Sequence, residues 1–220
     1  CLEHRGAVSS DGRTGDGAGI LMERPEIFFK KECKFNLPEF KEYAVGMVFL
    51  PPKKNQLNYC VDIFEEEIKR QGLNILGWRD VPVNSKVVGA IASQSQPNIK
   101  QVFIGKNDPN QTEKDFLLRL YISRKISENR IYQSKLSQRS FFYFSSLHNK
   151  TIIYKGLLIP EDIERFYIDL KNPMLVTRLA LVHQRFSTNT FPTWDLAQPF
   201  RYMCHNGEIN TLKGNINRMI

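Results

Sequence analysis

The 220-residue chain is poor in cysteine and has no long hydrophobic run. Its four cysteines, Cys1, Cys33, Cys60 and Cys204, form neither a Cys-x-x-Cys pair nor a metal-ligand spacing. This pattern favours free thiols in a reducing compartment over disulfide or metal cross-links. No apolar stretch approaches the roughly 20 residues that a membrane-spanning helix needs. We therefore expect no metal site in these residues and no membrane partner.

Basic residues are present but not concentrated. The formal net charge is +8, from 31 Lys and Arg against 23 Asp and Glu, yet the basic residues are spread along the chain. No nucleic-acid-binding module is recognisable, so we interpret the charge as a solvated surface and expect no nucleic-acid partner. A hydrophobic content of 41% is ordinary for a globular protein. At this length, we assign residues 1–220 to a single domain.

Hydrophobic periodicity predicts an α+β chain. The first nineteen residues are rich in glycine, aspartate and serine and are expected to be mostly loop after a helix end at Glu3. Strands are expected over residues 43–50, 99–104, 116–122, 179–184 and 201–204, with a β-hairpin formed by 141–146 and 151–158. Helices are expected over residues 55–71, 123–131, 160–167 and 210–219.

The segment from His183 to Gly214 is the richest in chemistry. Arg185 ends one apolar run, and a guanidinium can hold both oxygens of a carboxylate. Asn206 and Gly207 follow another run, and an amide beside an open backbone N–H can hold a developing oxyanion. The structural alternatives are a surface ion pair for Arg185 and an ordinary Asn-Gly turn between strands.

This segment resembles the class II, N-terminal-nucleophile glutamine amidotransferases, and in particular the amidotransferase domain of glutamate synthases. His-Arg-Gly and His-Asn-Gly elements are shared by the whole class, whereas the run from Ser187 to Trp194 narrows the resemblance to glutamate synthases. The resemblance implies the four-layer αββα sandwich of N-terminal-nucleophile hydrolases. Matching motifs, in chain order, are Leu2-Glu3-His4-Arg5-Gly6-Ala7, Asp11-Gly12, Thr14-Gly15-Asp16-Gly17-Ala18-Gly19-Ile20, Gly77-Trp78-Arg79-Asp80-Val81-Pro82-Val83, Ile153-Tyr154-Lys155-Gly156 and His183 to Asn210.

The resemblance also implies roles for individual residues. Asn206 and Gly207 would form the oxyanion hole, and Arg5 would steady the terminus of the nucleophile, with a loop salt bridge as an equal alternative for Arg5. The residues expected to contact the substrate L-glutamine are Arg185, which would hold the α-carboxylate, and Phe186, Ser187, Thr188 and His205. His4, His183 and His205 are expected to be structural rather than bases, because the α-amino group of the nucleophile is the base in this class. Phe191 and Trp194 are expected either to wall the glutamine pocket or to belong to the core.

The nucleophile of this class is an N-terminal cysteine followed by glycine. Cys1 is followed by leucine, and no Cys-Gly pair occurs in the chain. We therefore expect Cys1 to be an internal residue and the sandwich to be truncated at both ends, since Ile220 stops in mid-pattern. A fragment without the nucleophile is expected to be inactive alone. Two alternatives stay open: a self-contained amidohydrolase using Cys1, and a non-catalytic binding module that keeps the fold.

The implied function is release of ammonia from L-glutamine for the reductive amination of 2-oxoglutarate to L-glutamate. The synthase domains of the same parent chain would carry FMN and a 3Fe-4S cluster, whereas no cofactor site is expected in these residues. A composition rich in Lys, Asn and Ile suits an AT-rich genome. On that ground we expect ferredoxin as electron donor and the plastid (chloroplast) stroma as location, with a nicotinamide donor and the bacterial cytoplasm as the alternatives.

Overall fold

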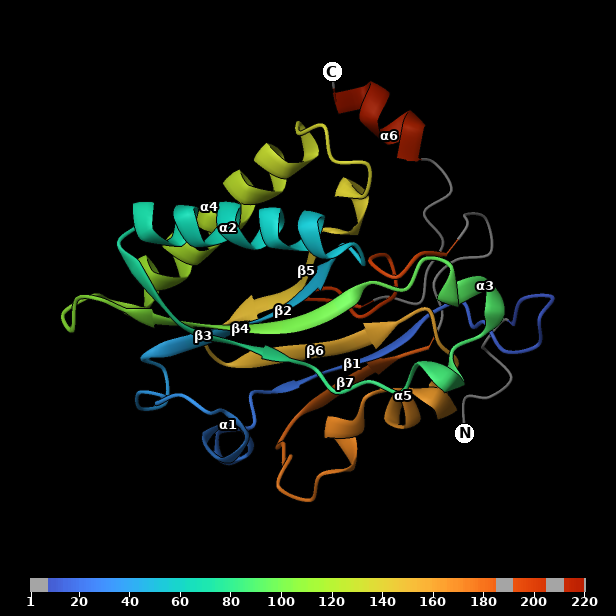
Figure 1. The fold of residues 1–220 in the computed structure, drawn as a ribbon, viewed down its shortest axis with the longest axis horizontal. Helices are drawn as coiled ribbons and strands as arrows, with labels where there is room; N and C mark the ends of the chain where they lie inside the picture. Colours follow the sequence, from blue (N-terminus) through green and yellow to red (C-terminus); the bar gives the residue numbers. More distant parts are fainter. Residues whose placement is uncertain (1–7, 185–191, 205–211, 220) are drawn as a thin grey trace.

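The computed structural model describes residues 8–184, 192–204 and 212–219. Within these ranges, the strands form one antiparallel sheet of order β3-β4-β2-β5 and another of order β6-β1-β7 (Figure 1), so the α+β class is confirmed. The strands are β1 (Ala18–Glu23), β2 (Tyr43–Leu50), β3 (Leu73–Asp80), β4 (Asn98–Lys106), β5 (Tyr143–His148), β6 (Thr151–Gly156) and β7 (Ala180–His183). The helices are α1 (Glu26–Glu32), α2 (Lys54–Arg70), α3 (Ala90–Ser93), α4 (Glu113–Tyr132), α5 (Pro160–Phe166) and α6 (Leu212–Met219), with short turns η2 (Ser85–Val87), η3 (Arg139–Phe141) and η4 (Ile168–Lys171).

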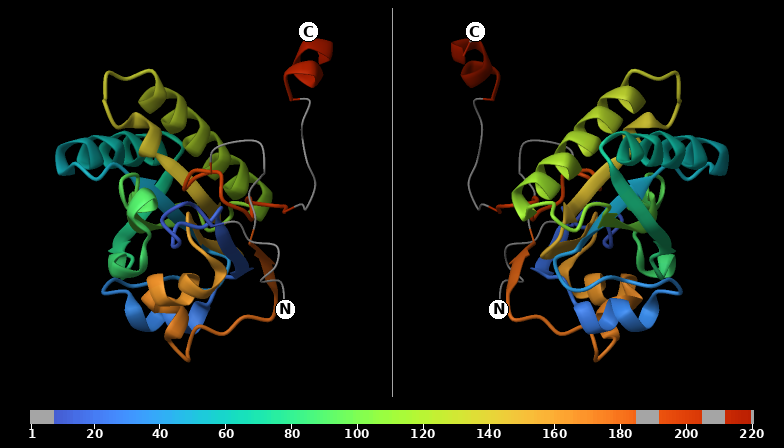
Figure 2. Two further views of the ribbon diagram at one scale, coloured as in Figure 1. Left: turned by 90° about the vertical axis from the view of Figure 1, so that its right-hand side faces the viewer. Right: turned by 90° about the vertical axis from the view of Figure 1, so that its left-hand side faces the viewer.

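Helices α2 and α4 cover one face of the four-stranded sheet (Figure 2). Strand β2 is buried along its whole length, as its continuous apolar run predicts. Helix α2 buries Leu57, Phe64 and Ile68 on one face, the spacing expected of an amphipathic helix. Cys60 lies on the same face, and burial raises the pKa of its thiol to about 12. It is therefore a neutral core residue.

The opposite face of that sheet packs against the sheet β6-β1-β7. Tyr43 and Phe103 from the first sheet share one apolar core with Met22 and Tyr154 from the second. Helix α5 contacts β1 and β6, and Figure 2 shows α1 and α5 on the side of the molecule away from α2 and α4. The sheets are therefore held by two cores, one between them and one beneath the long helices.

Several predicted elements are confirmed within one or two residues. They are the strands at 43–50, 99–104 and 179–184 and the helices at 55–71 and 160–167. The predicted strand at 116–122 is wrong, because these residues lie inside α4. Thr112 caps this helix by accepting from the Asp115 backbone N–H at 3.2 Å. Within the predicted strand, Phe116 and Leu120 are buried whereas Leu118 and Tyr121 are exposed, so apolar residues on both faces hide the helical period. The predicted helix at 123–131 is confirmed as the second half of α4.

The predicted hairpin of residues 141–146 and 151–158 is also wrong in its pairing. Both strands exist, but β5 pairs with β2 and β6 pairs with β1, so the chain crosses from one sheet to the other at the turn. Side chains replace the expected ladder: Ser145 Oγ donates to the Ile153 carbonyl at 3.2 Å, and Ser146 Oγ accepts from the Ile153 N–H at 3.1 Å. A turn between two β-rich runs therefore did not decide which strands pair.

One further prediction is corrected near the end of the chain. The segment 201–204 is a bend rather than a strand, closed by a hydrogen bond from the Phe200 N–H to the Met203 carbonyl at 2.8 Å. The first nineteen residues were expected to be mostly loop; residues 8–17 hold turns, bends and an isolated bridge between Val8 and Gly15, and β1 begins at Ala18. The predicted helix at 210–219 is seen from Leu212 to Met219; residues 210 and 211 lie outside the described ranges, as does Glu3.

Candidate active site

The residues to which the sequence assigns chemistry lie outside the described ranges. They are Arg5, Arg185, Phe186, Ser187, Thr188, His205, Asn206 and Gly207, together with Cys1 and Phe191. The structure describes the segments next to these residues in the sequence, which we call the frame. The frame consists of the loop after Arg5, strand β7 before Arg185, and the segment 192–204 between Phe191 and His205. The frame is built from the glycine-rich and Tyr-Lys-Gly motifs of the sequence.

Strand β7 leads directly to Arg185. It pairs with β1, with His183 opposite Gly19, and Lys155 of β6 lies opposite Gly19 on the other side. A Cβ on Gly19 would lie 2.5 Å from the Lys155 Cβ and 2.6 Å from the Gln198 carbonyl oxygen. Only glycine therefore allows the segment 192–204 to approach β1 at this point.

Trp194 anchors the beginning of the segment 192–204. Its side chain is 4% exposed, and its Nε1 donates to the Ala92 carbonyl at 3.1 Å. A Cβ on Gly156 would lie 2.5 Å from the Trp194 ring, so the Tyr-Lys-Gly motif ends in glycine where the indole packs. Trp194 is thus a core residue, and its edge also lines a hollow of about 180 Å³ beside Thr193 and Asp195.

The loop that follows Arg5 is held by Asp11. Its carboxylate accepts from Thr14 Oγ1 at 2.5 Å, from the Ile91 N–H at 3.0 Å and from two N–H groups of its own loop. These bonds, led by the Thr14 hydroxyl, hold the pKa of Asp11 well below its usual range. Gly12 in this loop adopts a φ of +67°, which favours glycine, and the Ile91 N–H ties the loop to α3.

Lys155 and Arg201 hold the middle and the end of the segment 192–204. Lys155 is fully buried, and its Nζ donates to the Asp195 carbonyl at 2.7 Å and to the Tyr143 hydroxyl at 3.2 Å. Arg201 Nη2 donates to the Phe144 carbonyl at 2.5 Å. Burial and the Arg201 charge lower the pKa of Lys155 to about 7. The segment is therefore attached to β5 and β6 by the side chains of Arg201 and Lys155.

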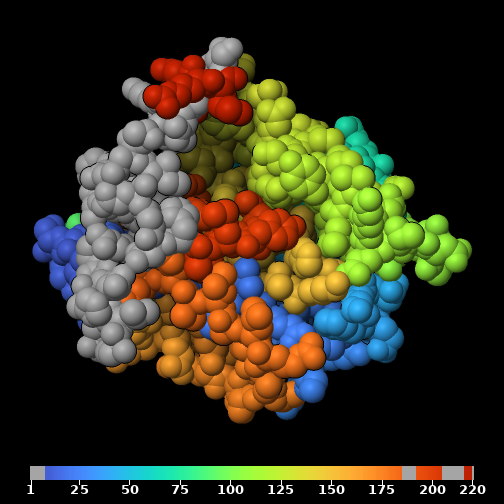
Figure 3. All heavy atoms as spheres, turned by 180° about the vertical axis from the view of Figure 1, so that it is seen from behind, coloured from blue at the N-terminus to red at the C-terminus, as the bar shows by residue number. Residues whose placement is uncertain are grey.

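A hollow of about 840 Å³ opens beside this attachment. It is lined by the second half of α4, by η3 and by Tyr143 and Arg201. Figure 3 shows it between the yellow-green residues of α4 and the red segment near residue 200. Glu128 in this hollow pairs with two arginines. It accepts a hydrogen bond from Arg124 Nη1 at 2.9 Å, and its carboxylate lies 3.6 Å from Arg201 Nη2.

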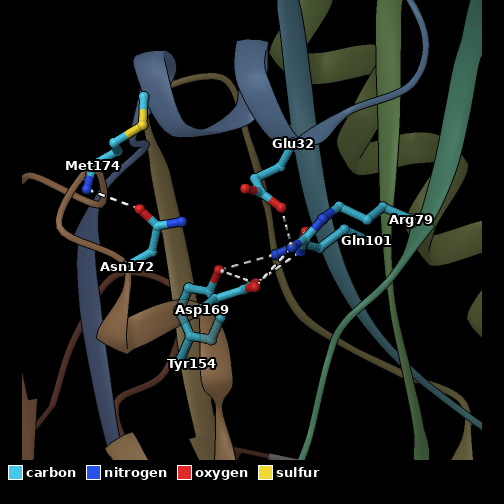
Figure 4. A network of polar contacts seen from close by, with 7 residues as sticks. All are labelled: Glu32, Arg79, Gln101, Tyr154, Asp169, Asn172 and Met174. Carbon is cyan, nitrogen blue, oxygen red and sulfur yellow. Dashed lines mark hydrogen bonds and ion pairs between the residues drawn. The ribbon is translucent and has the colours of Figure 1, made fainter.

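The Gly-Trp-Arg motif has a structural explanation. Arg79 on β3 forms a bidentate pair with Asp169 of η4, with both N–O distances at 2.7 Å (Figure 4). Gln101 on β4 accepts from Arg79 at 2.9 Å and donates to the Tyr154 hydroxyl at 3.1 Å. Tyr154 on β6 donates to Asp169 at 3.2 Å, and Glu32 lies 3.8 Å from the guanidinium. This network joins the two sheets and η4, so the motif supports the fold rather than the chemistry.

Three observations bear on cofactors, thiols and membranes. In the parts of the chain that the structure describes, no three His, Cys, Asp or Glu side chains gather in an arrangement that could hold a metal ion. Cys33, Cys60 and Cys204 are free thiols, and burial raises the pKa of Cys33 to about 11. None of the helices in the described ranges combines the length and the apolar character needed to cross a bilayer.

Sequence reasoning overlooked the residues that build the frame. Lys155 stood inside a quoted motif, and a lysine directly after the apolar residues Ile152–Tyr154 of β6 was the signal that could have singled it out. Asp11 also stood in a quoted motif. Ala92 donates its N–H to Thr14 and accepts from Trp194 at its carbonyl, and it carries no signal in the sequence because it acts through its backbone.

Comparison with known proteins identifies the class that this frame belongs to. The family model of the class II glutamine amidotransferases matches residues 1–220, and the chain belongs to this family. Among its relatives, the chain is 49% identical to the glutamate synthase [NADPH] large chain of Bacillus subtilis over 99% of this chain and 14% of the relative. It is 46% identical to the glutamate synthase [NADH] of Saccharomyces cerevisiae, over 99% of this chain and 10% of the relative. It is 42% identical to the chloroplastic/mitochondrial ferredoxin-dependent glutamate synthase 1 of Arabidopsis thaliana, over 100% of this chain and 14% of the relative. The chain thus spans between 10% and 14% of the length of these relatives.

Proposed function

We propose that this chain is the glutaminase domain of a glutamate synthase. It would release ammonia from L-glutamine and supply it for the reductive amination of 2-oxoglutarate to L-glutamate. The observation that carries the proposal is the match to the amidotransferase family over the whole chain, joined to 42–49% identity with proteins named glutamate synthase. The described frame supports it, because the quoted motifs build the attachment points of the segments that carry the predicted site.

The roles of the site residues follow the resemblance. Arg185 would hold the α-carboxylate of glutamine, with Phe186, Ser187, Thr188 and His205 lining the same pocket and Arg5 steadying the nucleophile. Attack on the carboxamide carbon forms a γ-glutamyl thioester on cysteine and releases ammonia, and water then hydrolyses the thioester to glutamate. The Asn206 amide and the Gly207 N–H would donate to the oxygen that becomes negative, each stabilising the transition state by about 3 kcal/mol.

The remaining features of the whole protein are part of the same proposal. FMN and a 3Fe-4S cluster would belong to the synthase part of the protein. The ammonia released from L-glutamine would pass to that part within the protein. We propose ferredoxin as the electron donor and the plastid stroma as the location, on the Lys-, Asn- and Ile-rich composition. The relatives are named for NADPH, NADH and ferredoxin in turn. Glutamate formation assayed with each donor separately decides between them, and activity with NADPH or NADH alone would overturn the ferredoxin assignment.

We also propose one domain over residues 1–220 and the four-layer αββα arrangement. Both cores share the strands of the sheet β3-β4-β2-β5, which supports a single folding unit. The layering is supported by α2 and α4 on one sheet and α5 on the other. Small-angle scattering and an experimental structure of the full-length protein test this arrangement.

Isotope tracing tests the function directly. The full-length protein is supplied with L-glutamine labelled with ¹⁵N at the amide, with 2-oxoglutarate and with a reductant. We expect the label in newly formed L-glutamate, and in free ammonia when 2-oxoglutarate is omitted. L-Asparagine is the matched control substrate, since it lacks one methylene. Absence of labelled ammonia from glutamine would contradict the proposal.

A further inference from the structure

Lys155 is a buried amine with a specific set of partners. It belongs to β6 and is 0% exposed. Its Nζ donates to the Asp195 backbone carbonyl at 2.7 Å and to the Tyr143 hydroxyl at 3.2 Å, and it lies 4.7 Å and 5.2 Å from the ring centroids of Tyr143 and Phe200. Asp195 and Phe200 both belong to the segment 192–204. The amine therefore bonds β6 to the backbone of this segment.

Burial and the nearest positive charge both disfavour the protonated form of the Lys155 amine. Arg201 of the same segment faces it and, after burial, is the main cause that lowers the pKa of Lys155 to about 7. The Asp195 carboxylate has the opposite effect but accepts from Thr193 Oγ1 at 2.7 Å rather than from Lys155. Arg124 and Glu128 of α4 lie beyond Tyr143. Among the described residues, no carboxylate forms an ion pair with Nζ, so an apolar side chain here would avoid a desolvation cost.

We propose that Lys155 is a positioning residue of the glutaminase reaction, and that its bond to the Asp195 carbonyl sets the place of the segment 192–204 for catalysis. This inference rests on the proposed function. In the sequence, the segment 192–204 lies between the two parts of the predicted site. The predicted glutamine contacts at 185–188 come before it, and the predicted oxyanion hole at 206–207 comes after it. One buried hydrogen bond would thus act on both parts of the site.

The packing explains why a shift of this segment cannot be absorbed elsewhere. Trp194 fixes the residue before Asp195 against Gly156, and the Gln198 carbonyl lies where a Cβ on Gly19 would stand. Between these two contacts, Lys155 supplies the side-chain hydrogen bond to the segment's backbone. Catalytic groups misplaced by about 1 Å can lose on the order of 100-fold in rate.

The test uses the full-length protein with Lys155→Met, which keeps the length of the side chain and removes the amine. We expect kcat/KM for L-glutamine to fall about 10- to 100-fold. Glutamate synthesis from free ammonia should stay within about twofold, and the melting temperature at pH 7 should be unchanged or higher because the desolvated amine is gone. Loss of activity without loss of stability is the result that a merely structural lysine would not give.

A second lysine serves as the control. Lys150→Met removes the lysine of the turn just before β6, where its Nζ pairs with Glu113 at 2.6 Å. It should keep kcat/KM within about threefold of the wild type.

The outcomes separate the inference from the function it rests on. Ammonia release by the wild type together with an unchanged kcat/KM in Lys155→Met would overturn the inference alone. A variant that fails to fold, or that loses stability and both activities together, would overturn it too, since Lys155 would then be structural. A wild type that releases no ammonia from L-glutamine would overturn the proposed function and the inference with it.

Discussion

Thr14 and Trp194 are joined through the backbone of a single residue. The Ala92 N–H donates to Thr14 Oγ1 at 3.2 Å, and the Ala92 carbonyl accepts from Trp194 Nε1 at 3.1 Å. The loop that follows Arg5 and the segment that precedes Asn206 therefore share one anchor on α3. Both bonds are buried; the Ala92 carbonyl also accepts from the Ser95 N–H at 3.2 Å, so it would keep a partner if the Trp194 bond were lost.

Trp194→Phe is expected to weaken this anchor while keeping most of the packing. The Ala92 carbonyl would lose the indole donor and keep the Ser95 N–H, so the loss is that of one buried hydrogen bond, about 0.5–1.5 kcal/mol of unfolding free energy. In the sequence, Trp194 lies between the predicted glutamine contacts at 185–188 and the predicted oxyanion hole at 206–207. The kcat/KM for glutamine should therefore fall as well. Urea denaturation and ammonia release from the full-length protein measure the two effects.

Trp78→Phe is the matched control for this prediction. Its Nε1 donates to Glu65 at 2.7 Å on the side of the sheet that faces α2, away from the segment 192–204. We expect a loss of stability with an unchanged kcat/KM. If the two variants lose glutaminase activity equally, the Trp194 anchor has no special connection to the site.

Stability is expected to depend on the titration of Lys155. Its folded pKa of about 7 lies below the ordinary value of 10.5, so the folded state prefers the neutral amine. Below about pH 7 the amine is protonated in both states, and the cost of burying the charge is fully present. Between pH 7 and 10.5 unfolding takes up a proton, so stability rises with pH. The melting temperature of Lys155→Met minus that of the wild type should therefore be greatest near pH 6 and shrink towards pH 9.

The comparison with Lys155→Met cancels the titration of all other groups. Melting curves collected at each pH in buffers of equal ionic strength are sufficient. A difference that stays constant from pH 6 to pH 9 would mean that Lys155 keeps its ordinary pKa in the folded protein.

Arg185→Lys is expected to weaken glutamine binding more than it slows a saturated site. The guanidinium would hold the α-carboxylate with two parallel bonds in both the ground state and the transition state, and an ammonium group offers only a point contact. The loss should therefore appear mainly as a higher KM for glutamine. Steady-state kinetics of the full-length protein, with free ammonia as the alternative nitrogen donor, measure it; a large fall in kcat at constant KM would contradict the assignment.

The sequence predicts elements well where one physical signal dominates. The unbroken apolar run of β2 and the amphipathic period of α2 each indicate one structure, and both are confirmed. The sequence fails where two signals compete: apolar residues on both faces of the first half of α4 disguise a helix, and a turn between β5 and β6 suggests a hairpin although the strands enter different sheets. Pairing across the core is decided by long-range packing, which no local window contains.

Site prediction divides in the same way. Motifs with unusual chemistry, such as the guanidinium and the Asn-Gly pair, indicate their roles from the sequence, and these remain predictions. The frame around them depends on contacts between residues far apart in the chain, such as Asp11 with Ile91 and Lys155 with Asp195. Several of these contacts use backbone atoms, so side-chain identity carries little trace of them.

Asn206→Ala tests the centre of the proposed site. If the Asn206 amide donates to the oxyanion, its loss should lower the glutamine-dependent kcat by roughly 10²–10³-fold in the full-length protein. The KM for glutamine should change little, because the donor is aimed at charge that exists only during the reaction. Ammonia release at saturating glutamine measures the first quantity, and its concentration dependence the second.

Synthesis from free ammonia separates a catalytic Asn206 from a residue that merely shapes an Asn-Gly turn. That half-reaction bypasses cleavage of the amide, so it should survive in Asn206→Ala if the residue is the oxyanion donor. A turn residue would, when replaced, lower stability and both activities together. A variant that folds normally and keeps the full glutaminase rate would remove Asn206 from the site, because no remaining role would need its amide.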